Sequence, residues 1–227
     1  MTAPQSGPVP LSEALRSRTA EIHHEAERSG IVADILRRKA DSRGYALLLR
    51  NLLPAYMRIE ELLSRHQDHP HLGPFAQPAL HRANAVRSDL ESIAGENWEH
   101  DLPLLDTTAR YVECISDAGS GDGLRLIPHG YVRYFGDLSG GQILKKLLGQ
   151  SMNLPPESLS LYDFPDISEI AAFKNRLRDS IDAAGQAVED PEVLIAEALL
   201  AFQMNVDLSN DVQAYVASSA EAKPASA

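Results

Sequence analysis

The chain has 227 residues, and its 32 acidic and 21 basic side chains give a net charge of −11. Hydrophobic residues make up 44% of it, which is typical of a globular protein and excludes a disordered or collagen-like chain. The acidic balance argues against nucleic acids and membrane surfaces as partners, because both are bound through basic clusters. The single cysteine, Cys114, excludes a disulfide framework and any cysteine-based zinc or iron–sulfur site, and fits a reducing, cytoplasmic setting.

The length favours one domain with a core that needs no disulfides. Residues 1–10 lack a secretion signal and are expected to be flexible, and the polar tail 218–227 is expected to be disordered. Residues 11–217 are therefore expected to form the domain. No uncharged run is long and apolar enough to suggest a membrane span.

Helical periodicity recurs along the chain, and no alternating run of β-branched and aromatic residues predicts a strand. Asp41 and Asp106 are expected to cap helices, and Asp190 with Pro191 is expected to begin the last one. Pro54 should kink the longest early helix. We therefore expect a single all-α domain, with helices over about 11–28, 31–38, 42–66, a segment ending near 94, 106–117, 124–151, 167–184 and 191–216.

Three glycines interrupt the helical pattern of the segment 131–146. Each interior glycine costs about 1 kcal/mol relative to alanine, so Gly136, Gly140 and Gly141 together forfeit roughly 2–3 kcal/mol of helix propensity. Gly136 and Gly140 are four residues apart, so they leave one helix face without side chains. Such a face suits either close packing of another helix or a planar cofactor. Asp137, beside this face, has either a polar role or ordinary contact with solvent.

Two other clusters contain chemically useful side chains. His23 and His24 point about 100° apart on one helix, so one can face inward while the other is solvated. Glu27 is four residues after His23 and could accept the second ring N–H of a metal-bound imidazole. Lys174 and Arg178 share one helix face and could hold an anionic group. For both clusters the ordinary alternative is a solvated helix surface.

Three segments together resemble the biliverdin-producing heme oxygenases. They read LSEALRSRTAEIHHEAE from Leu11, YVRYFGDLSGGQILKK from Tyr131 and AFQMNVDLSND up to Asp211. The resemblance covers nearly the whole expected domain, and the string GDLSGGQ is its most specific element. It implies a helical fold that holds heme between the first helix and a kinked, glycine-containing distal helix.

The resemblance also implies roles for individual residues. His23 matches the axial ligand of the heme iron, and Glu27 matches its neighbouring carboxylate. Gly136 and Gly140 match the glycines that flank the heme, and Asp137 matches the aspartate that holds water on the distal side. The other matches are a hydrogen-bonded network of Tyr56, Tyr131 and Arg133, basic residues Arg16, Lys174 and Arg178 that orient the heme propionates, and Phe202 and Asn205 as pocket lining.

Ala20 departs from this pattern, because a second basic residue often stands at this point of the first helix. The resemblance implies that heme b is both cofactor and substrate and is opened with O2 and external electrons to biliverdin, carbon monoxide and ferrous iron. Lys174 and Arg178 favour the α isomer. A ferredoxin, a flavodoxin-type protein or a reductase would supply the electrons near these two residues, with Lys145 and Lys146 as further candidates. A monomer is the expected state.

Other functions on a helical scaffold are less well supported. A di-iron carboxylate protein requires two Glu-x-x-His motifs, and the chain offers one, from Glu21 to His24. A heme carrier or sensor needs His23 but not the network around Asp137. A vitamin-processing relative or a helical interaction module gives no reason for the GDLSGGQ string. Whether the purpose is iron release or bilin supply stays open.

Overall fold

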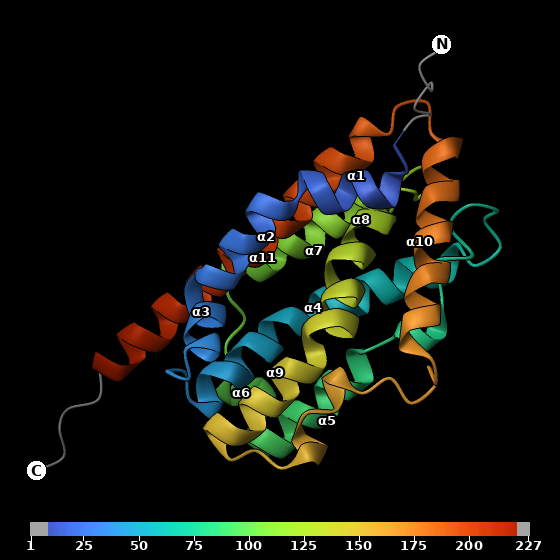
Figure 1. Cartoon of the computed structure of the whole chain (residues 1–227). Helices are drawn as coiled ribbons and strands as arrows, with labels where there is room; N and C mark the ends of the chain where they lie inside the picture. The colour runs from blue at the N-terminus through green and yellow to red at the C-terminus, as the bar shows by residue number, and fades with distance from the viewer. Residues whose placement is uncertain (1–8, 222–227) are drawn as a thin grey trace, which may run out of the picture.

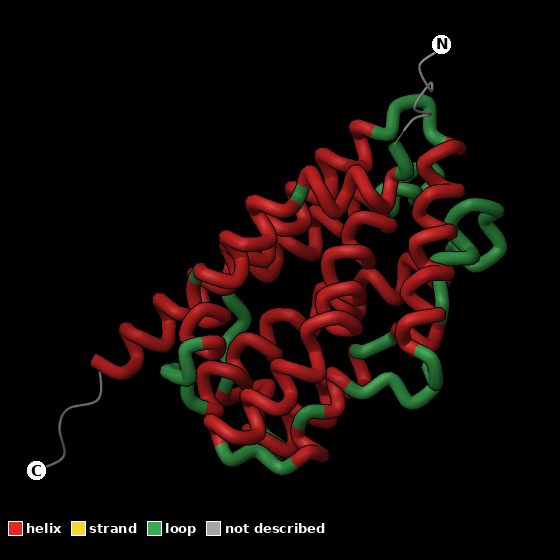
Figure 2. The backbone as a smooth tube through the Cα atoms, in the orientation of Figure 1, coloured by secondary structure: helices red, strands yellow, loops and turns green. Residues whose placement is uncertain are grey.

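The computed structural model describes residues 9–221, and every regular element among them is helical (Figures 1 and 2). The predicted all-α class is therefore confirmed. The α-helices are α1 Leu11–Arg18, α2 Ala20–Arg28, α3 Gly30–Leu36, α4 Ser42–Arg65, α5 Ala83–Ala94, α6 Trp98–Asp101, α7 Asp106–Ala118, α8 Leu126–Gly130, α9 Gly136–Met152, α10 Ile170–Ala187 and α11 Glu192–Glu221. Short 3₁₀ turns (η1 Pro78–Leu80, η3 Pro156–Ser158, η4 Ser160–Tyr162) and the π-helical segment η2 Tyr131–Phe135 connect them.

Two long helices organise the packing. The helix α4 runs through the middle of the molecule and packs on α5 and α7, while α11 lies along α2, α3, α7 and α8 (Figure 1). The helix α10 packs on α1 and stands at one side of the molecule (Figure 1). Fully buried side chains such as Leu15, Leu49 and Ile59 form a continuous core between these elements.

The expected first helix is divided at Thr19. This residue has φ −99° and ψ 1°, and both its N–H and its hydroxyl donate to the carbonyl of Leu15, at 3.0 and 2.7 Å. A threonine that bonds back to the preceding turn competes with the regular helical ladder, which explains the break. The ladder resumes at once, because the N–H of His23 donates to the carbonyl of Thr19 at 2.9 Å.

The expected helix over 124–151 is also irregular, although its glycines are not the irregular part. The backbone is π-helical over Tyr131–Phe135, and a regular helix starts at Gly136 and continues to Met152. A π-helical segment redirects the helix axis and is a recognised feature of functional sites. The distortion therefore precedes the glycines.

The predicted capping residues give mixed results. Asp41 caps α4, since its Oδ1 accepts the N–H of Gly44 at 2.8 Å. Asp106 does not cap α7: it is the first helical residue, and no side-chain cap bond is formed there. Its carboxylate still lies in the first turn, where it complements the helix dipole. Asp190 accepts the N–H of Glu192 at 3.0 Å and so begins α11 one residue later than expected.

Two carboxylates of the central helices, the buried Asp89 and the partly buried Glu60, accept backbone N–H groups at the start of other elements. Glu60 Oε1 accepts the N–H groups of Arg82 and Ala83, 2.5 and 2.9 Å away, at the start of α5. Asp89 accepts the N–H of Ser160 at 2.8 Å and thereby fixes η4. Burial raises the pKa of both carboxyl groups, and these hydrogen bonds partly offset that effect.

The last helix extends four residues beyond the expected domain end at 217, so residues 218–221 are helical. The expected flexible start at 1–8 and the rest of the expected tail, 222–227, lie outside the described residues. Within the described residues, no helix is long and apolar enough to cross a membrane.

Gly30 marks the closest approach between α3 and α11. Its φ is +56°, and a Cβ at this position would lie 2.2 Å from the backbone carbon of Ser209. Ser209 completes this contact: its hydroxyl donates to the carbonyl of Ser29 at 3.0 Å and accepts the N–H of Val32 at 3.1 Å. A side chain at position 30 would force the two backbones apart.

We expect Gly30→Ala to lower the free energy of unfolding by about 3 kcal/mol, from a left-handed backbone cost of roughly 1–2 kcal/mol and an overpacking cost of roughly 1–3 kcal/mol. Gly121 provides a matched control, because its φ is also positive but a Cβ there would meet nothing within 4 Å. Gly121→Ala should therefore show the backbone cost alone. Urea unfolding of both variants measures the difference, and equal losses would contradict the close approach.

Candidate functional site

The glycines of α9 serve two different purposes. A Cβ added to Gly136 or Gly140 would meet no atom within 4 Å, so the space beside this face is open. A Cβ on Gly141 would instead lie 2.9 Å from the ring of Tyr162. Helix packing therefore explains Gly141, whereas the open space beside Gly136 and Gly140 fits a flat ligand.

His23 lies on α2 with its side chain about half exposed, at 51%. Its ring meets Phe202 of α11 edge to face, with ring centroids 5.6 Å apart. Glu27 is 3.9 Å from Nδ1 of His23, which is too long for a hydrogen bond, and 3.5 Å from Nδ1 of His24. The imidazole is thus oriented by an aromatic neighbour and remains free to bind a ligand.

Asp137 is the buried acid of the site, with 7% of its surface exposed. The hydroxyl of Tyr56, from α4, donates to its Oδ2 at 2.8 Å. Burial raises the pKa of Asp137, and the charge of Arg133 together with the Tyr56 hydrogen bond partly offsets this rise. The group is therefore held by a specific donor and has an increased affinity for a proton.

Arg133 lies above the Tyr56 ring, with its guanidinium carbon 5.5 Å from the ring centroid. Its Nε and Nη1 are buried and have no hydrogen-bond partner among the described residues, as is also true of the hydroxyl of Tyr134. Burial alone would lower the pKa of Arg133, but Tyr56, Tyr111 and Asp137 outweigh it and raise that pKa. Unpaired buried donors of this kind indicate that water or a ligand completes the site.

Tyr131 packs against an aromatic neighbour. Its ring lies beside that of Phe135, with centroids 5.2 Å apart, and burial raises its pKa. A hydrogen bond with the Thr19 side chain and the charges of Arg16 and Arg178 partly offset this rise. No direct hydrogen bond joins Tyr131 to Asp137 among the described residues, so its place in the network with Tyr56 and Arg133 stays a prediction.

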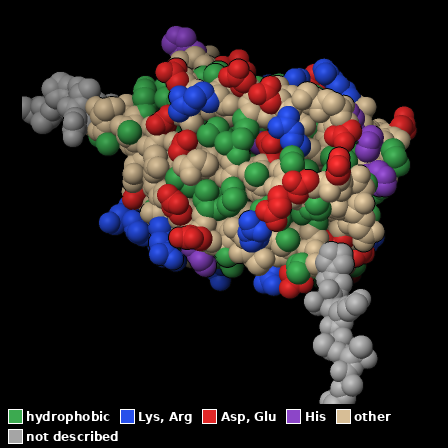
Figure 3. Space-filling view, turned by 90° about the horizontal axis from the view of Figure 1, so that it is seen from above, with side chains coloured by type: hydrophobic (Ala, Val, Ile, Leu, Met, Phe, Trp, Pro, Cys, Tyr) green, Lys and Arg blue, Asp and Glu red, His purple; other side chains and the backbone are tan. Residues whose placement is uncertain are grey.

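The basic residues of α10 contact the distal helix. Lys174 Nζ donates to the hydroxyl of Ser139 at 2.7 Å, and burial followed by the charge of Arg178 lowers the pKa of Lys174. Arg178 reaches over the Phe135 ring, 5.6 Å from its centroid. Lys145 instead pairs with Asp163 at 2.6 Å. On the face seen in Figure 3, basic and acidic side chains are intermixed.

The helix α11 supplies the remaining predicted residues. Asn205 Nδ2 donates to the hydroxyl of Tyr111 at 3.0 Å and to the carbonyl of Ala201 at 2.7 Å. Phe202 is buried, one turn before Asn205 and in contact with His23. The helix α11 therefore contacts both His23, through Phe202, and Tyr111, through Asn205.

Ser139, Tyr111 and Tyr162 were missed by the sequence analysis. Ser139 stands between Gly136 and Gly140, so its position beside the bare face offered a signal. Tyr111 and Tyr162 are fully or nearly fully buried. Their positions in the pattern look like ordinary core, and no feature of the sequence indicates that their hydroxyls face polar partners.

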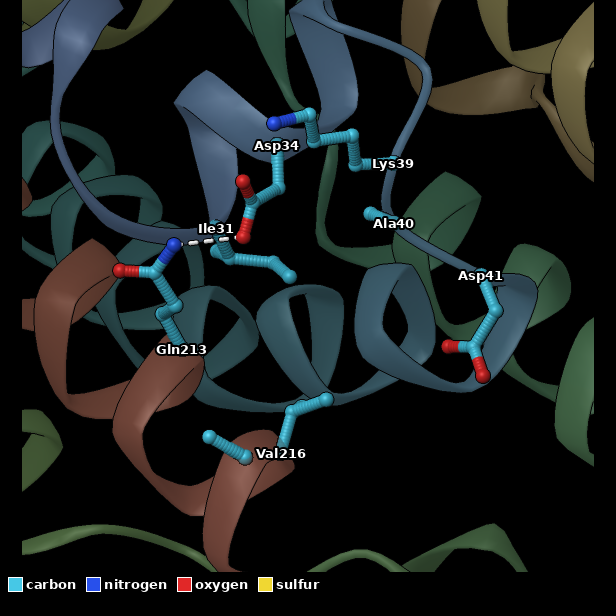
Figure 4. Close-up of a pocket in the computed structure, with 8 residues that line it drawn as sticks. Ile31, Asp34, Lys39, Ala40, Asp41, Gln213 and Val216 are labelled. Carbon is cyan, nitrogen blue, oxygen red and sulfur yellow. Dashed lines mark hydrogen bonds between the residues drawn. The ribbon is translucent and has the colours of Figure 1, made fainter. Parts of the chain in front are cut away.

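The residues present fit heme. The open face at Gly136 and Gly140 accommodates a flat ring, the half-exposed His23 can ligate iron, and the unpaired donors of Arg133 can hold water. A hollow of about 390 Å³ lies elsewhere, between α3, α4 and α11 (Figure 4). It contains none of the predicted site residues, and the amide of Gln213 donates to Asp34 there at 2.5 Å.

The chain is similar to known proteins along nearly its whole length. The heme oxygenase family model matches residues 9–211. Bovine heme oxygenase 1 is 32% identical over 211 residues, which cover 92% of this chain and 73% of that protein.

Two solved structures are similar along nearly their full length. Heme oxygenase 1 from Synechocystis, solved in complex with heme, is 32% identical with a TM-score of 0.84, covering 94% of this chain and 96% of that one. Heme oxygenase from Leptospira interrogans, also 32% identical, has a TM-score of 0.82 over 89% of this chain and all of that chain. The chain therefore belongs to the heme oxygenase family, whose members are enzymes that degrade heme with O2 and electrons from a donor.

Proposed function

We propose that this protein opens heme b to biliverdin, carbon monoxide and ferrous iron, with residues 11–217 as the catalytic domain. The observation that carries the proposal is the combination of an open glycine face with a buried acid, Asp137, directly beside it. A heme carrier would need the open face and His23 but has no use for a buried carboxyl group with a dedicated donor, Tyr56.

We assign His23 as the axial ligand. Its half-exposed ring and its edge-to-face contact with Phe202 support this role, because the ring is oriented and accessible. When bound, the heme iron supplies the binding and reduction of O2 and the oxidation of its own ring. Glu27, 3.9 Å away, would act on His23 only after a small side-chain rotation.

Asp137 is proposed to hold the water that delivers protons on the distal side. Its raised pKa makes the carboxyl group a competent proton relay, and Tyr56 fixes its direction. Arg133 contributes two buried donors without partners that can hold the same water. Gly136 and Gly140 bring no side chain of their own to this face, so they place no competing acid or base there.

The heme carboxylates are proposed to meet Arg16, Lys174 and Arg178. In support, Arg16 and Arg178 both act on the pKa of Tyr131, and Lys174 is directed toward the distal helix by Ser139. This orientation favours the α isomer of biliverdin. Ala20 leaves the first helix with a single basic residue for this purpose.

We further propose a cytoplasmic monomer that receives electrons from a ferredoxin, a flavodoxin-type protein or a reductase. An acidic donor would approach near Lys174, Arg178 and Lys146. Lys145 is a weaker candidate than its sequence position implied, since its ammonium group is paired with Asp163. The sole cysteine supports the cytoplasmic location.

Turnover tests the function directly. With heme, a reducing system and air, the protein should form biliverdin, identified by its spectrum and by chromatography of its isomers. His23→Ala should still bind heme but lose activity, and added imidazole should restore part of it by filling the space left by the ring. His24→Ala is the control and should behave like the parent; the reverse pattern would assign the ligand to His24.

Two matched variants distinguish the two roles of the α9 glycines. Gly140→Ala should raise the free energy of unfolding of the heme-free protein by about 0.5–1 kcal/mol, because it stabilises the helix and meets nothing. The same change should weaken heme binding at least tenfold. Gly141→Ala should destabilise the protein through its contact with Tyr162. Unfolding and heme titration measure both effects, and tight heme binding by Gly140→Ala would remove the open face from the site.

The raised pKa of Asp137 predicts a pH-dependent stability. Between the ordinary aspartate pKa of about 3.9 and its higher folded value, the folded protein binds more protons than the unfolded chain. This contribution to stability is therefore complete below the unfolded pKa and is lost as the pH rises through the folded one. Asp137→Asn should lack this slope, and Tyr56→Phe should extend it to higher pH.

Urea unfolding of the heme-free protein across this pH range measures the slopes. Parallel curves for the parent and Asp137→Asn would contradict the raised pKa. In turnover assays, Asp137→Ala should bind heme and form little biliverdin, while Asp137→Asn keeps part of the activity because an amide can still hold water.

A further inference from the structure

Three helices bring together a cysteine, a histidine and a carboxylate that the proposed heme site does not use. Cys114 comes from α7, His129 from α8 and Glu197 from α11. The His129 side chain is fully buried and that of Glu197 is 6% exposed, whereas Cys114 is partly exposed. Each offers one potential ligand atom, and these three atoms all lie within 4.8 Å of one another.

The separations are close to those of a metal-bound set. Cys114 Sγ is 4.0 Å from Glu197 Oε1, and His129 Nε2 is 2.9 Å from the same oxygen. Zinc bonds of ~2.3 Å to sulfur and ~2.0–2.1 Å to nitrogen or oxygen, at tetrahedral angles, separate ligand atoms by roughly 3.3–3.6 Å. One distance is slightly longer and the other slightly shorter, so small side-chain rotations suffice.

The surroundings prepare Glu197 and His129 for this role. Arg125 donates to the other carboxylate oxygen, Oε2, at 3.1 Å, which leaves Oε1 directed at Cys114 and His129. The buried Nδ1 of His129 has no hydrogen-bond partner among the described residues. A tautomer shift that moves the ring proton from Nε2 to Nδ1 would free Nε2 to become a ligand.

We propose that Cys114, His129 and Glu197 bind a divalent transition cation of the Zn²⁺ class, with a water in the fourth position. Binding forms a bond from the metal to Sγ and breaks the S–H bond, and the proton leaves to solvent. The cation reaches the site from the partly exposed Cys114 side. This proposal goes against the exclusion of cysteine-based sites that was drawn from the cysteine count, because a mixed set from three helices shows no spacing signal in the sequence.

The described residues contain one other such group, formed by His23, His24 and Glu27, and all three are exposed. Of that group, His23 and Glu27 belong to the proposed heme site. The Cys114 group differs because two of its members are buried and come from separate helices. A cation there would tie α7 to α11, whose Tyr111 and Asn205 are hydrogen-bonded to each other.

Cobalt(II) is the probe for the test. Titrating the full-length, heme-free protein with Co²⁺ without oxygen should produce a thiolate-to-cobalt charge-transfer band that saturates at one equivalent. Cys114 is the sole cysteine, so this band reports on it alone. Zn²⁺ should displace the band and raise the melting temperature. ¹¹³Cd NMR of the unaltered protein should independently show one sulfur ligand.

Variants separate this site from the exposed histidines. Cys114→Ser should abolish the band and weaken Zn²⁺ binding at least tenfold, and Glu197→Gln should weaken it similarly. His24→Ala, which disrupts the exposed group, should leave the band unchanged. Absence of the band and of a sulfur-bound cadmium signal in the parent protein would overturn the proposal, as would unchanged Zn²⁺ affinity in Cys114→Ser.

Discussion

The burial of one carboxyl group constrains the centre of this structure. Asp137 has almost no contact with solvent, and a buried carboxyl group without a partner is strongly unfavourable. Tyr56 provides the partner, which fixes the register of α4 against α9. The π-helical segment places Arg133 above the same tyrosine, so the charge of the acid is balanced from a second direction. The open glycine face is therefore always presented beside a polar group of defined orientation.

Two other carboxyl groups also fix the position of neighbouring elements. Asp89, which is buried, and Glu60, which is partly buried, each accept backbone N–H groups at the start of another element. Asp89 fixes η4 and with it Tyr162, which fills the space beside Gly141. The position of α9 thus depends on the Tyr56 hydrogen bond from α4 on one side and on the contact with the Tyr162 ring on the other.

Sequence reasoning succeeded where a local pattern carries the information. Helical periodicity predicted the all-α class, and the spacing of Gly136 and Gly140 predicted a bare face that the structure leaves open. It failed where tertiary contacts decide. The cap expected at Asp106 is not formed, and the break at Thr19 depends on which way its hydroxyl turns. A cluster assembled from three helices is invisible to spacing.

The helix that carries His23, α2, contributes little buried surface to the fold. No residue of α2 is buried, although α11 and α3 pack along it. Its share of the hydrophobic stabilisation is small, so local opening of α2 should require less free energy than global unfolding. In hydrogen-exchange terms, its amides should exchange rapidly in the ligand-free protein and slow when a flat apolar ligand covers its inner side. Loading of the site is then coupled to the folding of one helix.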